Sequence, residues 1–371
     1  MMPETRGGRP LDRRHRLGLG TFCTNLSGGC TMSDIEGILQ ADWPTTTALA
    51  QLAEAMDFEA IVPVGRWKGF GGRTDFNGAG FESYTWAAGI SASTRRAGVF
   101  ATSHVSTVHP IVAAKQATTI DHISNGRFGL NVVTGWYQPE MEMFGTALLE
   151  HDRRYDMAAE WLGVVRRLWT EDEPFDFSGA FYTLKQARLR PKPIQQPHPV
   201  VMCAGSSDKG RHFAAQHADV SFVNVERGEP DAMRAQVDSI RRLAREEYGR
   251  DIQVWTYAYV FQAETEAEAK RFYDYTVFEH GDWPGADNLI HMMEINSQSF
   301  SPEMLHSLEE RFVAGWAGFP LVGTPDQVVD GLRLIADAGF DGTLLSWPRY
   351  LQDMQVFKDR TLPLLEQAGL R

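Results

Sequence analysis

The chain alternates short apolar runs with longer amphipathic segments. In "TTTALAQLAEAMDF" (45–58), apolar residues recur at spacings of three and four, which predicts a helix with one buried face. The run "EAIVPV" (59–64) follows directly and is short and apolar, which is typical of a buried strand. The same strand-and-helix alternation continues to the end of the chain.

Eight strands are expected from this pattern. They cover 17–24, 59–64, 97–104, 127–134, 199–205, 219–224, 252–261 and 342–347. The helices between and after them cover 45–58, 82–94, 110–123, 153–169, a segment from 207, 230–248, 264–278, a segment from 325 and the end of the chain. Two insertions interrupt the order: 174–198 is rich in proline and aromatic residues, and 280–320 is expected to be rich in loops.

Repeated strand–helix–strand crossovers produce a parallel sheet with helices outside it, and eight such strands close into a barrel. We therefore predict an α/β fold, a (β/α)8 TIM barrel with insertions. The alternative is a doubly wound open sheet, but "GLGTFC" (18–23) lacks the third glycine of a dinucleotide-binding turn. The barrel is expected to be a single domain over 17–371, and residues 1–16 are expected to form a flexible tail.

Composition narrows the class of partner and the compartment. The chain has 371 residues, 43% of them hydrophobic and 23% charged, with a net charge of −12, which argues against nucleic acid and anionic membranes. Three cysteines without CxxC spacing argue against a disulfide framework or a zinc site and favour the reducing cytoplasm. No run approaches the ~18 apolar residues of a membrane span, and the arginine-rich start lacks the apolar segment of a signal peptide.

Polar residues follow the expected barrel strands, where a TIM barrel carries its active site. The third strand ends in Thr102-Ser103-His104, and the fourth contains Asn131 and runs into Trp136. The turn "AGSSDKG" (204–210) at a helix start is a candidate phosphate site, because free N–H groups and serine hydroxyls meet there. Each feature has a plainer interpretation: Asn131 satisfying a buried backbone group, His104 solvated in a loop, and a simple serine cap.

Sequence signatures of several enzyme classes are absent. There is no HExxH, GxSxG or GxxxxGK[ST] motif and no cluster of histidine and carboxylate at metal spacing. We therefore expect no metal and no side-chain nucleophile. An enzyme with a polar and aromatic barrel mouth but no nucleophile is expected to use an organic cofactor.

Several longer motifs are similar to those of a known family. The segments "GFGGRTDF" (69–76), "TIDHISNGRFGLNVVTGW" (119–136), "EHDRRYDMAAEWLGVVRRLW" (150–169) and "RPKPIQQPHPV" (190–200), together with "AGSSDKG", resemble the bacterial luciferase-like FMN-dependent monooxygenases. Within that family the resemblance is to the pyrimidine and dimethyl sulfone monooxygenases. It extends from about residue 17 to the end of the chain and is weakest over 280–320.

The resemblance implies a chemistry and a set of partners. A barrel of this family holds reduced FMN, which a separate NAD(P)H-dependent flavin reductase supplies. Oxygen adds to the flavin, and the resulting flavin peroxide, attached at N5 in the pyrimidine enzymes, attacks a small organic substrate. A heterocyclic amide or an organosulfur compound, cleaved at a C–N or C–S bond, is the implied substrate. A homodimer or homotetramer is the implied assembly.

The resemblance also assigns residues. FMN contacts fall on Gly65, Arg66, Asn131, Trp136, Glu140, Arg154, Tyr155 and Ser207. Thr102 and Asn131 are the implied catalytic pair, which holds dioxygen beside the flavin. The chain departs from the pyrimidine enzymes at Arg66, where they have lysine, and at Trp67 and His104. Trp67, Phe70 and His104 are therefore the candidate substrate contacts.

Two alternatives share the barrel. One is a deazaflavin-dependent oxidoreductase that transfers hydride, against which Arg154-Tyr155 and the Thr102–Asn131 pair argue. The other is a non-catalytic flavin-binding relative, which the joint presence of Thr102, Asn131 and Trp136 disfavours.

Overall fold

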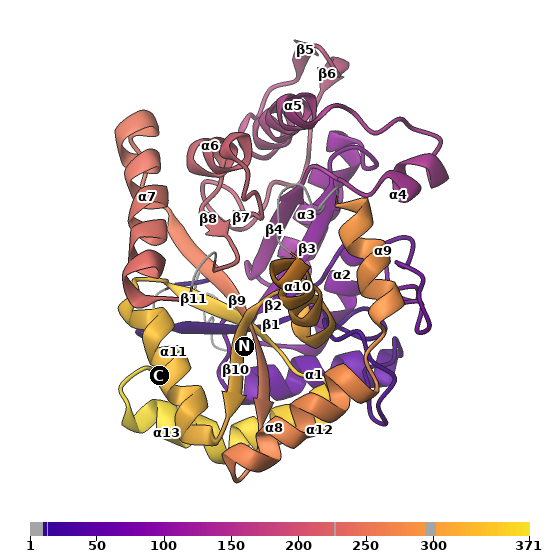
Figure 1. Cartoon of the computed structure of the whole chain (residues 1–371). Helices are drawn as coiled ribbons and strands as arrows, with labels where there is room; N and C mark the ends of the chain where they lie inside the picture. Colours follow the sequence, from indigo (N-terminus) through magenta and orange to yellow (C-terminus); the bar gives the residue numbers. More distant parts are fainter. Residues whose placement is uncertain (1–9, 13, 226–227, 294–301) are drawn as a thin grey trace.

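The computed structural model describes residues 10–12, 14–225, 228–293 and 302–371. Eight parallel strands form a closed barrel, which confirms the predicted TIM-barrel fold (Figure 1). They are β1 (Gly18–Phe22), β2 (Ala60–Val62), β3 (Gly98–His104), β4 (Phe128–Val133), β7 (Val200–Cys203), β8 (Val220–Phe222), β9 (Gln253–Gln262) and β11 (Gly342–Ser346). The strands lie in the order β9-β11-β1-β2-β3-β4-β7-β8, and pairing of β8 with β9 closes the ring.

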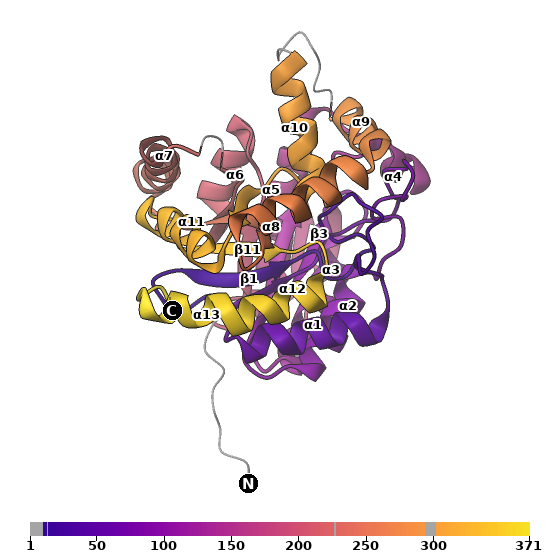
Figure 2. The same cartoon turned by 60° about the horizontal axis from the view of Figure 1, so that its bottom comes forward.

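Helices surround the strands (Figure 1). They are α1 (Trp43–Ala55), α2 (Ser83–Ser93), α3 (Pro110–Ile123), α4 (Gln138–Met143), α5 (His151–Thr170), α6 (Asp208–His217), α7 (Pro230–Tyr248), α8 (Glu266–Asp274), α9 (Trp283–Met292), α10 (Pro302–Gly315), α11 (Pro325–Asp337), α12 (Tyr350–Val356) and α13 (Leu362–Gln367). Two π-helical segments, η1 (Tyr275–Glu279) and η2 (Phe357–Thr361), continue α8 and α12. The first helix, α1, lies beside α12 near the end of the chain, so segments from both ends contribute to one helical layer (Figure 2).

The first insertion, 174–198, contains a two-stranded antiparallel hairpin, β5 (Phe175–Ser178) and β6 (Thr183–Ala187), which lies outside the barrel (Figure 1). The second, 280–320, is more regular than its sequence indicates. It forms α9 and α10 and then β10 (Phe319–Gly323), which pairs with the second half of β9. In Figure 2, α9 and α10 lie at the opposite end of the molecule from α1, α12 and α13. Residues 294–301 lie outside the described part of the chain.

Large side chains fill the barrel interior. The ring of Trp255 lies over β1 and β11, where a Cβ on Gly18 or Gly342 would come within 2.7 Å or 2.5 Å of it. Only glycine fits at these two positions, because a close-packed interior leaves no room for an added carbon. Gly18 and Gly342 are the first residues of β1 and β11, so Trp255 fills the end of the barrel where the strands begin.

The start of the described chain contacts the base of the barrel, the end where the strands begin. Leu11 is buried beside the interior side chains, Arg14 forms an ion pair with Asp57, and His15 Nε2 lies within hydrogen-bond distance of the same carboxylate at 3.1 Å. Much of the predicted flexible tail, 1–16, lies outside the described residues, which omit 1–9 and 13. None of the described helices is long and apolar enough to span a membrane.

Candidate functional site at the barrel mouth

Thr102 and Asn131 lie opposite each other on the neighbouring strands β3 and β4. The Asn131 Nδ2 donates to Thr102 Oγ1 at 3.1 Å, and Thr102 Oγ1 donates to the carbonyl of Pro63 at 2.6 Å. The Pro63 carbonyl only accepts, so the hydroxyl proton must point to it, and Asn131 must turn its amino group to Thr102. This order leaves Asn131 Oδ1 buried and without a hydrogen-bond partner.

Arg66 and Glu140 form a buried ion pair above this strand pair. Arg66 Nη1 lies 3.3 Å from Glu140 Oε1, and the two side chains are 4% and 1% exposed. The same carboxylate oxygen accepts the backbone N–H groups of Trp67 and Lys68 at 2.6 and 3.2 Å. Glu140 on α4 therefore fixes the loop that follows β2.

Aromatic rings surround the Arg66 guanidinium. Its Cζ lies 4.5 Å from the Phe70 ring centre, 5.3 Å from that of Tyr137 and 5.6 Å from that of Trp136. Phe70 stacks on Trp136 with an angle of 11° between the ring planes. Such contacts between a cation and ring faces are stabilising, and they are stronger where water is excluded. Arg66 Nε and Glu140 Oε2 are nevertheless both buried without a hydrogen-bond partner.

His104 lies beside Gly65, which directly precedes Arg66 in the loop after β2. A Cβ on Gly65 would lie 3.2 Å from His104 Cε1 and 3.1 Å from the Thr102 carbonyl oxygen. Burial lowers the pKa of His104 to about 4; Glu140 opposes this change and Arg66 adds to it. The imidazole is therefore neutral at physiological pH. It lines a cavity of about 20 Å³, room for one water molecule, together with Gly65, Arg66 and Thr102.

Arg154, Tyr155 and Ser207 lie next to this group. Arg154 Nη1 donates to the Gly135 carbonyl at 2.7 Å, and its Nε is buried without a partner. The Tyr155 hydroxyl interacts with Ser207, the N-cap of α6, whose Oγ accepts from the N–H of Gly210 at 3.1 Å. The serine cap expected as the plainer interpretation is thus present. It leaves the other N–H groups at the start of α6 available for an anion.

The predicted site residues thus lie in one continuous arc from β3 and β4 through Gly65 and Gly135 to the start of α6. Trp67 differs in placement: it is 40% exposed and meets Phe144 edge to face at 5.1 Å, so it lies on the rim. The described residues contain no group of three or more His, Cys, Asp or Glu placed to hold a metal ion.

Two aromatic residues at this site were missed in the sequence. Tyr137 donates its hydroxyl to the Gly69 carbonyl at 2.8 Å, and only its position beside Trp136 could have indicated this. Trp316 packs on Phe70 with ring centres 5.4 Å apart. It follows α10 in a segment expected to be loop-rich, and sequence spacing does not reveal a contact over so many residues.

The chain's sequence is similar to those of proteins with known activities. The model of the luciferase-like monooxygenase family matches residues 19–342. The chain belongs to this family. It is 31% identical over 364 residues to the pyrimidine monooxygenase RutA of Acinetobacter baylyi, covering 94% of each chain. It is 32% identical over 350 residues to the FMNH2-dependent dimethylsulfone monooxygenase of Pseudomonas putida, covering 92% of this chain and 93% of the relative.

Solved structures agree on the fold. DmoA from Hyphomicrobium sulfonivorans superposes with a TM-score of 0.83 at 22% identity, over 95% of this chain and 89% of the other. The family relationship confirms the expected enzyme class, a flavin-dependent monooxygenase.

Proposed function

We propose that the chain is the oxygenase of a two-component system that uses reduced FMN and O2 to oxygenate a small organic substrate. A separate NAD(P)H-dependent flavin reductase would supply the reduced FMN. The proposal includes the finer expectations: attachment of oxygen at flavin N5, cleavage of a C–N or C–S bond in a heterocyclic amide or organosulfur compound, a cytoplasmic location and a homodimer or homotetramer. The named substrates of the two relatives, a pyrimidine and dimethyl sulfone, support this choice of substrate class.

The observation that carries the proposal is the unpaired Oδ1 of Asn131. A buried amide oxygen without a partner costs about 1–3 kcal/mol, so a fold that retains it is expected to offer it to a ligand. The hydrogen bonds through Thr102 to Pro63 fix the amide so that this oxygen is the free atom. An N–H group of the reduced flavin ring is the partner that the proposal assigns to it.

The surrounding residues fit the rest of FMN. Arg154, Tyr155 and the N-terminus of α6 at Ser207 would hold the phosphate, since a guanidinium and free helix N–H groups both bind anions. Gly65, Arg66 and Glu140 would border the ring system, and Trp136 would form a wall. When bound, reduced FMN supplies the electrons that activate O2. Thr102 and Asn131 would hold the oxygen, and the rings around Arg66 would keep water out.

Removing the hydroxyl of Thr102 on β3 tests the proposal. Thr102→Ala is expected to lower turnover by about 10²–10³-fold, the usual effect of removing one positioned hydrogen-bonding group. FMN affinity, measured by quenching of flavin fluorescence, should change by less than about threefold because the other contacts remain. Thr119→Ala, which removes an exposed hydroxyl on α3, is the matched control and should change neither quantity.

The wild-type protein provides the second test. After anaerobic reduction of the FMN-loaded protein and mixing with oxygen, a heterocyclic amide or organosulfur substrate should appear in oxygenated form. Formation of free hydrogen peroxide alone with every such substrate would contradict the proposal. Tight binding of a deazaflavin without binding of FMN would favour hydride transfer instead.

A further inference from the structure

His104 is the last residue of β3 and points into the mouth from the same face of the strand as Thr102. Its side chain lies between two glycines: a Cβ on Gly65 would be 3.2 Å from His104 Cε1, and one on Gly135 would be 3.8 Å from Cδ2. The residue is 7% exposed. Its side chain lines the small cavity together with Gly65, Arg66 and Thr102. The absence of a side chain at Gly65 leaves room for the ring, whereas a Cβ on Gly135 would only make an ordinary contact with it.

The ring has no hydrogen-bonding partner. Among the residues that the structure describes, none donates to or accepts from either nitrogen of His104, whereas the rings of His122 and His212 bond to the Lys192 carbonyl and the Tyr248 hydroxyl. A neutral imidazole has one donor and one acceptor, and buried polar groups in folded proteins are nearly always satisfied. Neither His104 nitrogen is among the fully buried atoms that lack a partner, so the ring can reach a partner in the cavity, and this points to a ligand.

The charges facing this ring cancel. Among the described residues, Arg66 is the cation that affects its pKa, and Glu140 on α4 neutralises that cation at 3.3 Å. The imidazole itself is neutral because burial and Arg66 lower its pKa to about 4 against the opposing effect of Glu140. Arg66 Nε and Glu140 Oε2 both lack a hydrogen-bond partner, so the region offers one free donor and one free acceptor but no net charge. An anionic substrate group would lose its hydration here without gaining a counter-charge.

We infer that His104 recognises an uncharged hydrogen-bonding group of the substrate, such as a carbonyl, amide or sulfonyl group, and that the barrel mouth rejects anionic substrates. This inference rests on the proposed function, because it assumes a substrate bound beside the flavin. It goes beyond it by naming the charge class of that substrate and the side chain that selects it.

Two pairs of probes test the charge class with FMN-loaded protein. Uracil is compared with uracil-6-carboxylate, and dimethyl sulfone with methanesulfonate, by isothermal titration calorimetry. At least one uncharged probe should bind, and more than about tenfold tighter than its anionic counterpart, since a buried charge without a partner is disfavoured. Equal or tighter binding of the anions, or no binding of any of the four, would overturn the inference.

Variants of His104 test the residue. His104→Leu should weaken the uncharged probe by about tenfold or more, while His104→Gln, which keeps a donor and an acceptor, should stay within about threefold. The matched control is His109→Gln, on the exposed N-cap of α3, which should bind like the wild type. Wild-type affinity for the uncharged probe should also be constant between pH 6 and 8, because His104 does not titrate in that range.

The same titrations separate this inference from the proposed function. FMN affinity should be unchanged in both His104 variants. Loss of FMN binding in His104→Leu, with folding intact by circular dichroism, would make His104 a cofactor contact and overturn the inference alone. A wild-type protein that does not bind FMN would instead contradict the proposed function.

Discussion

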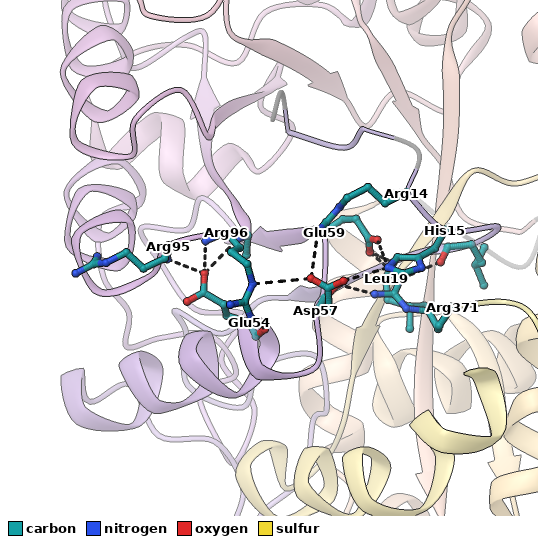
Figure 3. Close-up of polar contacts among 11 residues, drawn as sticks. Arg14, His15, Leu19, Glu54, Asp57, Glu59, Arg95, Arg96 and Arg371 are labelled. Carbon is teal, nitrogen blue, oxygen red and sulfur yellow. Dashed lines mark hydrogen bonds and ion pairs between the residues drawn. The ribbon is translucent and has the colours of Figure 1, made fainter. Parts of the chain in front are cut away.

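At the base of the barrel, Glu59 and Arg371 form an ion pair at 2.8 Å in which both side chains are 3% exposed. The same carboxylate accepts the backbone N–H of Leu19, and Arg371 also donates to the carbonyls of Leu17 and Asp57 (Figure 3). Glu59 Oε1 has no hydrogen-bond partner, but His15 Nε2 lies 3.7 Å from it, and no nitrogen of Arg371 is buried without a partner. At the mouth, Arg66 and Glu140 are equally buried, and Arg66 Nε and Glu140 Oε2 both lack hydrogen-bond partners. The base uses its buried charges to join the two ends of the chain.

The difference lies in the two guanidinium groups: that of Arg371 is held by the fold, whereas that of Arg66 keeps a donor available for binding. Figure 3 shows the base pair inside a wider set of contacts that includes Asp57, Arg14 and His15. At the mouth, the unpaired atoms of Arg66, Glu140, Asn131 and Arg154 face the ends of the strands, where a TIM barrel binds its ligands. Substitutions at the base should therefore change stability, and those at the mouth should change binding and turnover.

Removing Glu59 should produce the largest effect. Glu59→Leu leaves the buried Arg371 guanidinium without its counter-charge, which typically costs about 3–5 kcal/mol of unfolding free energy. Urea unfolding should show this loss, while FMN affinity of the folded fraction stays at the wild-type value. The control is Glu171→Leu, whose carboxylate pairs with Arg167 at the surface and should cost less than about 1 kcal/mol. A loss of that small size for Glu59→Leu would remove the distinction between the two ends.

Asn131→Leu should have the opposite pattern. The substitution removes the unpaired amide oxygen, and Thr102 keeps its bond to Pro63, so stability should change by no more than about 1 kcal/mol. Turnover should fall by about 10²-fold or more, because the group proposed to hold the flavin and oxygen is gone. Urea unfolding and steady-state assays on the same preparation measure both. A stability loss as large as that of Glu59→Leu would show that the amide is structural.

Lowering the pH should reduce the stability of the protein through His104 at the mouth. Its pKa is lowered to about 4 in the folded chain, so the unfolded chain binds more protons between that value and the ordinary 6.5, and stability falls as pH falls through this window. The wild type should lose about 2 kcal/mol more than His104→Gln between pH 7 and pH 5. Urea unfolding at several pH values measures the difference. Parallel curves for the two proteins would show that the ring is not buried as described.

The sequence predicted the parts of the molecule that depend on local pattern. The alternation of strands and helices predicts the eight-strand barrel, and the order of the strands predicts that Thr102 and Asn131 lie on neighbouring strands. The family motifs then indicated Arg66, Glu140 and Arg154, which the structure brings to the same mouth. Their proposed roles toward FMN stay predictions.

Contacts between distant segments were not predictable in this way. Glu59 and Arg371 are 312 residues apart, and no spacing rule connects them. The segment 280–320 has glycine, proline and serine between its apolar residues, which hides the period of α10 and the strand β10 that follows. Trp316 was missed for this reason. The full set of partners of Glu140 also depends on how α4 folds back on the loop after β2.

Asp57→Asn should have the smallest effect on stability. The pH dependence of that effect should lie at lower pH than the pH dependence caused by His104. Burial alone would raise the pKa of Asp57, but the hydrogen bond with His15 and the charges of Arg14 and Arg371 lower it below 3.8. Its contribution is therefore complete above that ordinary value and is lost as pH falls through the lower folded pKa. Asp57→Asn should lie below the wild type in stability by a constant small amount from pH 7 to 5, and the two curves should converge only below about pH 4. Because the carboxylate is about half exposed, solvent screening keeps the difference small. Convergence already between pH 6 and 5 would mean that the base titrates in the same window as His104, and the two ends would no longer be separable by acid.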